Sequence, residues 1–212
     1  MKIRKRGVGP ASSIRGGGPV STPKRPIGGR PLRADALRNR QRLLAAADAA
    51  FAEEGLSVSL DEIARRAQVG AGTVHRHFPT KEALIGAVIA SRLEALSIDA
   101  RTLANAADPG DSFYDFFTRL VIEGAASHAL AAGLVASGVD VDAVVSKPVR
   151  DLMVSLAKLL RRAQRAGVVR KDIRASDLPA LLAGAHAIER HPAGGKRGLA
   201  IFCDALRPSR SR

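Results

Sequence analysis

Residues 59–82 constrain the fold of this chain more than any other stretch, because they predict two short helices joined by a tight turn. Ser59 is followed three residues later by Glu62, and such a pair caps the N-terminus of a helix reciprocally. The apolar residues that follow recur at three- and four-residue steps, at Leu60, Ile63, Ala64 and Ala67. We therefore predict a helix that is capped by Ser59 and buries one face.

The turn and the second helix follow directly. Residues 68–70 break the apolar pattern, and Gly70 either adopts a positive φ or caps the next helix without a Cβ clash. Residues 71–78 form about two helical turns, with Val74 and Phe78 four apart on the buried side. Pro79 prevents this helix from continuing. Two helices in this arrangement place the second in a DNA major groove, while the first lies across it.

The residues from about Arg38 to Val88 resemble the N-terminal domain of the tetracycline-repressor (TetR) family of bacterial transcription factors. The strongest part of the resemblance is the run at 72–84, and residues 51–55 and 63–67 support it in the same order and at family-like spacing. The chain departs from the family pattern at His75, where an aromatic residue is usual, and at Gly70, where a serine cap is frequent.

Composition predicts an all-α chain, because alanine, leucine and arginine dominate and only six Phe and one Tyr are present. At 212 residues the chain is long enough for two modest domains. The resemblance implies an N-terminal helix-turn-helix DNA-binding domain and a larger helical domain for ligand binding and dimerisation. We predict a disordered basic arm at 1–31, the DNA-binding domain at 32–82, the regulatory domain at 83–206 and a disordered tail at 207–212.

The net charge of +14 is unevenly distributed, because residues 1–31 hold eight basic residues and no acidic residue. An excess of this size indicates a polyanionic partner. On DNA the basic arm would add phosphate contacts or enter the minor groove. The alternative for the arm is solubility alone.

The first helix is predicted at residues 34–54, and Gly55 ends it in the left-handed conformation. Its apolar stripe, which should pack on Ile63, Val74 and Phe78, consists of Leu37, Leu44, Ala47 and Phe51. A long helix capped by Thr80 then runs to about residue 106, a length of ~37 Å at 1.5 Å per residue.

The rest of the chain predicts further helical segments. They lie at 112–126, 127–137, 139–146, 148–166, 176–190 and 197–206, with a break before Pro148. Residues 161–173 resemble the regulatory domain of a subset of the same family. The resemblance implies a homodimer through 148–166 and 176–190, packed as a four-helix bundle; an internal core is the alternative for their leucine- and alanine-rich faces.

Helix chemistry and the resemblance together select the candidate DNA contacts. They are Arg40, Ser59, Gln68, Ala71, Gly72, Thr73, His75, Arg76, His77 and Lys81. Ser59 and Thr73 lie at helix N-termini, whose positive ends favour phosphate. The resemblance implies a phosphate contact for Lys81, and His75 can donate one hydrogen bond. Arg76 either pairs with a guanine or contacts a phosphate.

A ligand pocket is predicted in the second domain. Its candidate lining is Phe113, Phe116, Phe117 and His128, for which ordinary core packing is the alternative. The resemblance implies a repressor that leaves a pseudo-palindromic operator when a small-molecule effector tilts the long helix. Two rivals remain, a non-specific nucleoid-type DNA binder and a helical small-molecule-binding protein without a DNA role.

The remaining chemistry points away from an enzyme, a cofactor and a resident metal. The sequence contains no phosphate-binding glycine loop, paired-cysteine spacing or nucleophile elbow. His75 and His77 are two apart, about 200° around a helix, so they do not share a metal; a site assembled from His128, His186 and His191 is the open alternative. A single cysteine, Cys203, and the lack of an apolar run of ~18 residues fit a cytoplasmic protein.

Overall fold

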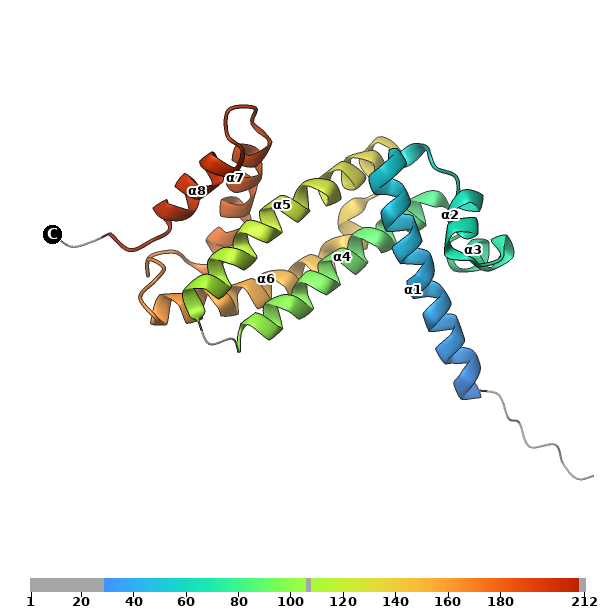
Figure 1. Ribbon diagram of the computed structural model, residues 1–212, viewed down its shortest axis with the longest axis horizontal. Helices are drawn as coiled ribbons and strands as arrows, with labels where there is room; N and C mark the ends of the chain where they lie inside the picture. The colour runs from blue at the N-terminus through green and yellow to red at the C-terminus, as the bar shows by residue number, and fades with distance from the viewer. Residues whose placement is uncertain (1–28, 106–107, 210–212) are drawn as a thin grey trace, which may run out of the picture.

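The computed structural model describes residues 29–105 and 108–209, and within them it contains helices and no strand (Figure 1). The elements are α1 (Gly29–Glu54), the 3-10 turn η1 (Gly55–Ser57), α2 (Leu60–Ala67), α3 (Ala71–His77), α4 (Lys81–Leu103), α5 (Pro109–Ala136), α6 (Val141–Arg165), the 3-10 turn η2 (Ala175–Asp177), α7 (Leu178–Arg190) and α8 (Gly195–Ala205). The all-α prediction is confirmed. Of the predicted arm and tail, residues 1–28 and 210–212 lie outside the described residues, whereas 29–31 belong to α1.

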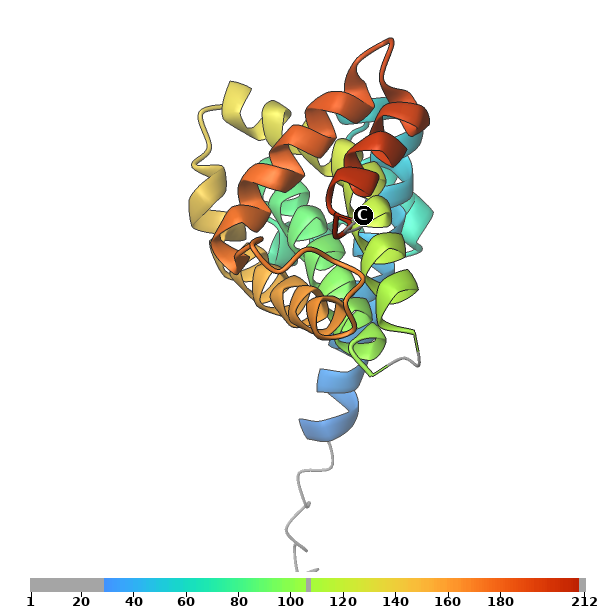
Figure 2. The same cartoon turned by 90° about the vertical axis from the view of Figure 1, so that its left-hand side faces the viewer.

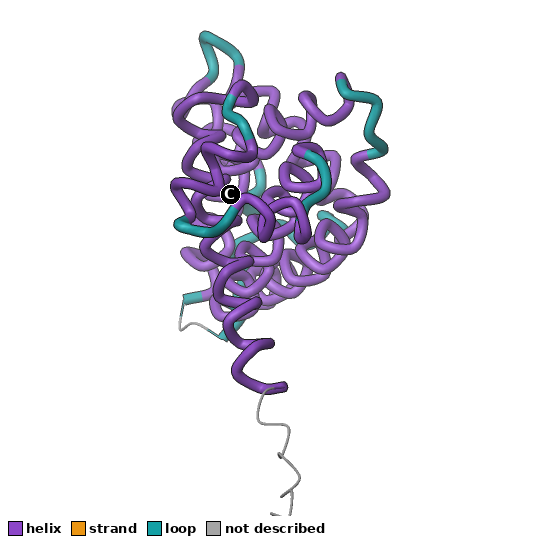
Figure 3. The backbone as a smooth tube through the Cα atoms, turned by 90° about the vertical axis from the view of Figure 1, so that its right-hand side faces the viewer, coloured by secondary structure: helices purple, strands orange, loops and turns teal. Residues whose placement is uncertain are grey.

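The helices form a three-helix body with a small unit at each end. α4, α5 and α6 pack on one another, α7 and α8 form a hairpin against α5 at one end, and α1–α3 lie at the other (Figures 1 and 2). Loops occupy only short stretches between the helices (Figure 3). α4 belongs to both the body and the N-terminal unit, so a displacement of this helix moves the two together.

The N-terminal unit packs around the residues that the apolar pattern selects. Its core includes Leu44, Ala47, Phe51, Ile63, Ala64, Val74, Phe78, Leu84 and Val88. Gly55 adopts a φ of +67° and ends α1, as predicted. The prediction that Leu37 packs in this core is wrong, because this side chain is 59% exposed. The first turns of α1 extend past α2 and α3 (Figure 1).

The body has its own core, and two of its helices, α5 and α6, are longer than predicted. Residues 109–136 form one helix, and α6 runs through Pro148, where a break was predicted. Proline in a helix removes one backbone hydrogen bond and costs ~3 kcal/mol. The buried face of α6 nevertheless continues on both sides of this residue, since Val145, Pro148 and Leu152 are all buried. Packing of that buried face keeps α6 a continuous helix.

α5 has 28 residues and a mean hydropathy of 1.2 in its most apolar window, enough to cross a membrane by length and composition. The core helix of a soluble protein passes the same test. Here the first half of α5 places Phe113, Phe116 and Phe117 in the core of the body. The helix also packs against α4, α6 and α7. Its most apolar window is nevertheless only 22% buried, and a single helix of this kind is weak evidence for a membrane span.

Candidate nucleic-acid interface

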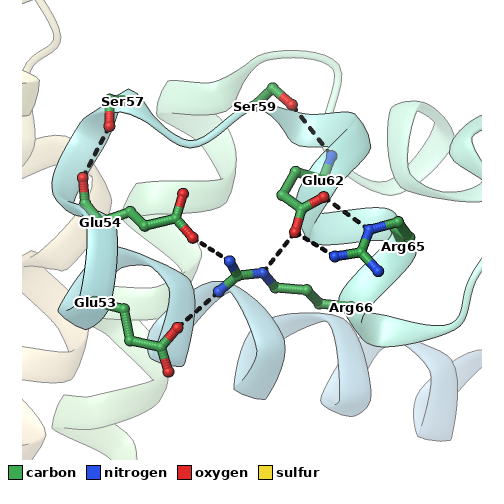
Figure 4. A network of polar contacts seen from close by, with 7 residues as sticks. All are labelled: Glu53, Glu54, Ser57, Ser59, Glu62, Arg65 and Arg66. Atoms are coloured by element: carbon green, nitrogen blue, oxygen red, sulfur yellow. Dashed lines mark hydrogen bonds and ion pairs between the residues drawn. The ribbon is translucent and has the colours of Figure 1, made fainter.

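The start of α2 is fixed by the side chain of Ser59. Its Oγ accepts a hydrogen bond from the backbone N–H of Glu62 at 3.1 Å. The reciprocal half of the predicted capping pair is replaced by another interaction. The carboxylate of Glu62 accepts hydrogen bonds from Arg65 at 2.7 and 2.8 Å and from Arg66 at 2.8 Å (Figure 4).

Arg66 connects this helix to the end of α1. Its guanidinium donates to Glu53 at 2.9 Å and also bonds Glu54, so one side chain joins three carboxylates on two helices (Figure 4). The guanidinium groups of Arg65 and Arg66 lower the pKa of Glu62 from its ordinary 4.5 to about 2. The network sets the position of α2 against α1.

Acid should weaken this network over a defined pH range. A carboxyl group with a lowered pKa in the folded state stabilises that state above its ordinary pKa, and the stabilisation disappears as the pH falls through the folded-state value. We therefore expect the unfolding temperature of the wild type to exceed that of Glu62→Gln between pH 5 and 7. The difference should shrink as the pH falls from about 4.5 towards about 2. Thermal unfolding followed by circular dichroism measures it.

Glu94→Gln is the matched control, because Glu94 is exposed on α4 away from the network. Its unfolding temperature should equal that of the wild type throughout this pH range. A Glu62→Gln deficit that persists unchanged at pH 2.5 would contradict the role given to the carboxylate.

The turn between α2 and α3 has an unexpected left-handed residue. Gln68 adopts a φ of 55° and its N–H bonds the carbonyls of Ala64 and Arg65. Gly70 has a φ of −65° and is the N-cap of α3, which is the second of the two predicted alternatives. The positive φ of this tight turn thus falls on an ordinary residue two positions before the glycine.

α3 shows one face to the core and the other to solvent. Val74 is fully buried, and Phe78, which caps the helix one residue earlier than predicted, is also buried. The exposed residues of this helix are Ala71, Gly72, His75, Arg76 and His77. A Cβ on Gly72 would meet nothing within 4 Å, so packing does not require glycine there. The exposed face is free to meet a partner.

The other predicted contacts surround α3 on neighbouring elements. Ser59 and Gln68 are exposed, Thr73 is half-buried, and the guanidinium of Arg40 lies 5.6 Å from the centre of the Phe78 ring. The ammonium of Lys81 donates to the backbone carbonyl of Leu56 in η1. Lys81 therefore connects the first turn of α4 to the N-terminal unit, a role that the sequence did not indicate.

The two histidines near this surface have different neighbours. His75 lies 3.9 Å from the carboxylate of Asp61 on α2, and the ring of His77 is 6.4 Å from that of Phe78. Across residues 29–105 and 108–209, no three side chains of His, Cys, Asp or Glu come together as a metal-binding group.

A second candidate site is a cavity of about 310 Å³ among α4, α5, α6 and α7. Of the four predicted lining residues, His128 lines it. Phe113, Phe116 and Phe117 do not line it and are buried in the core of the body, as in the core-packing alternative. His186 of α7, which the sequence did not single out for this pocket, lines the cavity, and its ring centre is 4.9 Å from that of His128.

Two families of known proteins match this chain in order. The family described as bacterial regulatory proteins, tetR family, matches residues 43–88, and the C-terminal domain of SbtR-like transcriptional regulators matches residues 108–208. The HTH-type transcriptional regulator UidR of Escherichia coli (strain K12) is 30% identical over 152 residues, covering 67% of this chain and 74% of UidR.

Solved structures agree with these matches. The TetR transcription regulatory protein from Mycobacterium vanbaalenii is 43% identical with a TM-score of 0.70, and the match covers 84% of this chain and all of that one. The TetR transcriptional regulator SCO0520 from Streptomyces coelicolor is 35% identical with a TM-score of 0.66, covering 80% of this chain and 99% of its own. This chain therefore belongs to the TetR family of DNA-binding transcriptional regulators, a non-enzymatic family whose members bind operator DNA and small-molecule effectors.

Proposed function

We propose that this protein is a cytoplasmic repressor that binds a pseudo-palindromic operator as a homodimer and leaves it when a small molecule binds. The observation that carries the proposal is α3, which has its apolar side buried at Val74 and its polar side exposed at His75 and Arg76. A helix presented in this way fits the major groove.

The proposed contacts divide by chemistry. Ser59, Thr73 and Lys81 lie at the N-termini of α2, α3 and α4, where backbone N–H groups and the helix dipole favour phosphate. Arg40 adds positive charge beside α3, and the bare backbone of Gly72 permits close approach to the duplex. Arg76 reads a base, because its fork of donors matches the two acceptors of guanine. The lesser contacts are Gln68, Ala71, His75 and His77.

The proposed dimer interface lies on the α7–α8 hairpin. The leucine face of residues 148–166 is buried inside the same chain at Leu152, Leu156, Leu159 and Leu160, which is the internal-core alternative for this face. The α7–α8 hairpin keeps apolar side chains exposed, at Ala180, Ala183 and Ala187 on α7 and at Ala200 and Ile201 on α8. We propose that this hairpin packs on its copy about a twofold axis.

Release from DNA would proceed through α4. Ile89 of this helix lines the cavity and also belongs to the core of the N-terminal unit. Arg92, one turn further along, donates to Asp48 of α1 at 2.6 Å. A molecule that displaces α4 at the cavity therefore changes the position of α1–α3. The size of the effect is limited by the preference of that molecule for the displaced state.

A gel shift with the DNA upstream of the protein's own gene tests the proposal. We expect retardation that competitor DNA of unrelated sequence does not abolish and that weakens steeply with salt. Equal affinity for every DNA would instead favour a nucleoid-type binder. A complete lack of DNA binding by a folded dimer would reject the DNA role.

Variants of the interface should separate its two kinds of contact. Thr73→Ala combined with Lys81→Ala should weaken binding to operator and unrelated DNA alike, because it removes phosphate contacts, and should reduce the salt slope by about 1. Arg76→Ala should cost about 1–3 kcal/mol on the operator and relax specificity at one base pair. Fluorescence anisotropy on labelled duplexes measures both. A double variant that binds as the wild type does would refute the phosphate assignment.

A further inference from the structure

We propose that the cavity among α4–α7 takes an uncharged, mainly apolar molecule that carries one hydroxyl group, which His128 and His186 bind. This inference rests on the proposed function and specifies the chemistry of its effector. The cavity of about 310 Å³ lies at the lower end of the range for small-molecule sites.

The walls of the cavity are aliphatic and come from four helices. They include Leu93 of α4, Leu120 of α5, Val145 and Leu152 of α6 and Leu182 of α7. Burial of a hydrocarbon group against these side chains contributes ~25 cal/mol per Å² of apolar surface removed from water. The body of the bound molecule is therefore apolar.

Charge is missing from this lining. Among the described residues that line the cavity there is no Asp, Glu, Lys or Arg, and the polar side chains are those of Ser127, His128 and His186. An ion transferred into such a site loses its hydration without gaining a counter-charge, which is costly. The lining therefore disfavours cationic and anionic molecules.

The polar end of the cavity is a histidine pair between α5 and α7. The two imidazole rings meet edge to face, with centres 4.9 Å apart and planes at 84°. His128 is exposed and His186 is 8% exposed, so the pair runs from the surface inwards. Gly124 provides the space for the inner ring, since a Cβ there would lie 2.2 Å from Nε2 of His186.

Nε2 of His186 is buried and has no hydrogen-bond partner among the described residues. Burial lowers the pKa of His186 and the nearby His128 lowers it further, against raising contributions from the backbone of Leu120 and Leu182, so the neutral form of the ring is favoured. A neutral imidazole offers one donor and one acceptor. A hydroxyl group also donates one hydrogen bond and accepts another, so it can bridge two such rings. Because Nε2 is shielded from water, the histidine pair must rearrange for a hydroxyl group to reach it.

Calorimetric titration with three probes of one shape tests the proposal on the wild-type protein. The probes are 4-pentylphenol, 4-pentylanisole, which replaces the hydroxyl by a methyl ether, and 4-pentylbenzylamine, which is cationic at pH 7. We expect the phenol to bind at least about tenfold more tightly than the ether, the equivalent of one hydrogen bond. The amine should bind at least about tenfold more weakly than the phenol.

Histidine variants assign the discrimination to the pair. His128→Phe and His186→Leu should each reduce the phenol-to-ether ratio to below about threefold and leave binding of the ether nearly unchanged. His191→Phe is the matched control, because His191 is exposed at the end of α7 and does not line the cavity; it should keep the wild-type ratio. Since His128 is exposed, its variant should fold even if the His186 variant does not.

Failure to bind the phenol, equal binding of phenol and ether by the wild type, or a ratio that survives in His128→Phe would each overturn the proposal. The proposed function is assessed separately by adding 4-pentylphenol to the operator complex. If the phenol binds through the histidine pair but leaves the operator complex intact, the ligand chemistry stands and ligand-induced release is rejected.

Discussion

Phe117→Ala is expected to destabilise the protein by about 3–5 kcal/mol, the cost of removing a large buried ring whose site cannot collapse fully. Phe117 is fully buried. Its ring stacks on Phe113 and Phe202 with centre distances of 5.9 and 6.2 Å, so it joins two turns of α5 to α8. Urea unfolding at 25 °C, followed by circular dichroism, measures the loss in the free energy of unfolding.

The same experiment separates a core residue from a ligand contact. Phe202→Ala is the comparison, because Phe202 is only partly buried and should cost clearly less. If Phe117 contacted a ligand, as the sequence suggested, Phe117→Ala would change the affinity for that ligand and leave the free energy of unfolding nearly unchanged. A loss below about 1 kcal/mol would therefore contradict the assignment of this phenylalanine to the core.

Ile201→Arg should convert the proposed dimer into a monomer and weaken operator binding by about 10²–10⁴-fold. The loss of affinity has this size because two linked DNA-binding units bind more tightly than one by a factor of that order. Ile201 is 61% exposed on α8, in the middle of the surface that we propose to meet its copy. A buried arginine without a partner opposes association. Sedimentation velocity gives the mass, and anisotropy on the full operator gives the affinity.

Ile122→Arg is the matched control. Ile122 is also an exposed isoleucine, 45% exposed on α5, outside the α7–α8 hairpin. It should leave both the mass and the operator affinity as in the wild type. If Ile201→Arg remains dimeric while Ile122→Arg dissociates, the interface lies on α5 instead.

Local rules predicted the N-terminal unit well. The serine cap at Ser59, the end of α1 at Gly55 and the burial of Val74 and Phe78 were all recognisable, because each depends on residues within a few positions along the chain. Helix type and order in the body were also recognisable from apolar spacing. The exposed face of α3 follows from the same spacing.

Long-range packing explains the errors. Pro148 predicts a break, but the apolar face of α6 is buried on both sides of it. The three phenylalanines of α5 were assigned to a pocket, because sequence spacing does not show which buried face has a space beside it. His128 and His186 are 58 positions apart in the numbering, and only the packing of α7 on α5 brings them together. Leu37 has the right spacing, yet its side chain is 59% exposed.

The core of the N-terminal unit is completed by Leu130 and Leu134 of α5 and by Val145 of α6. Leu56 packs so closely on α5 that a Cβ on Gly133 would lie 2.0 Å from its Cδ1. In a chimaera that exchanges only residues 29–82 with a relative, the N-terminal unit of the relative would therefore pack against α5 and α6 residues that do not match its core. To redirect this regulator to another promoter, residues 130–145 should be grafted together with the N-terminal unit, because they complete its core.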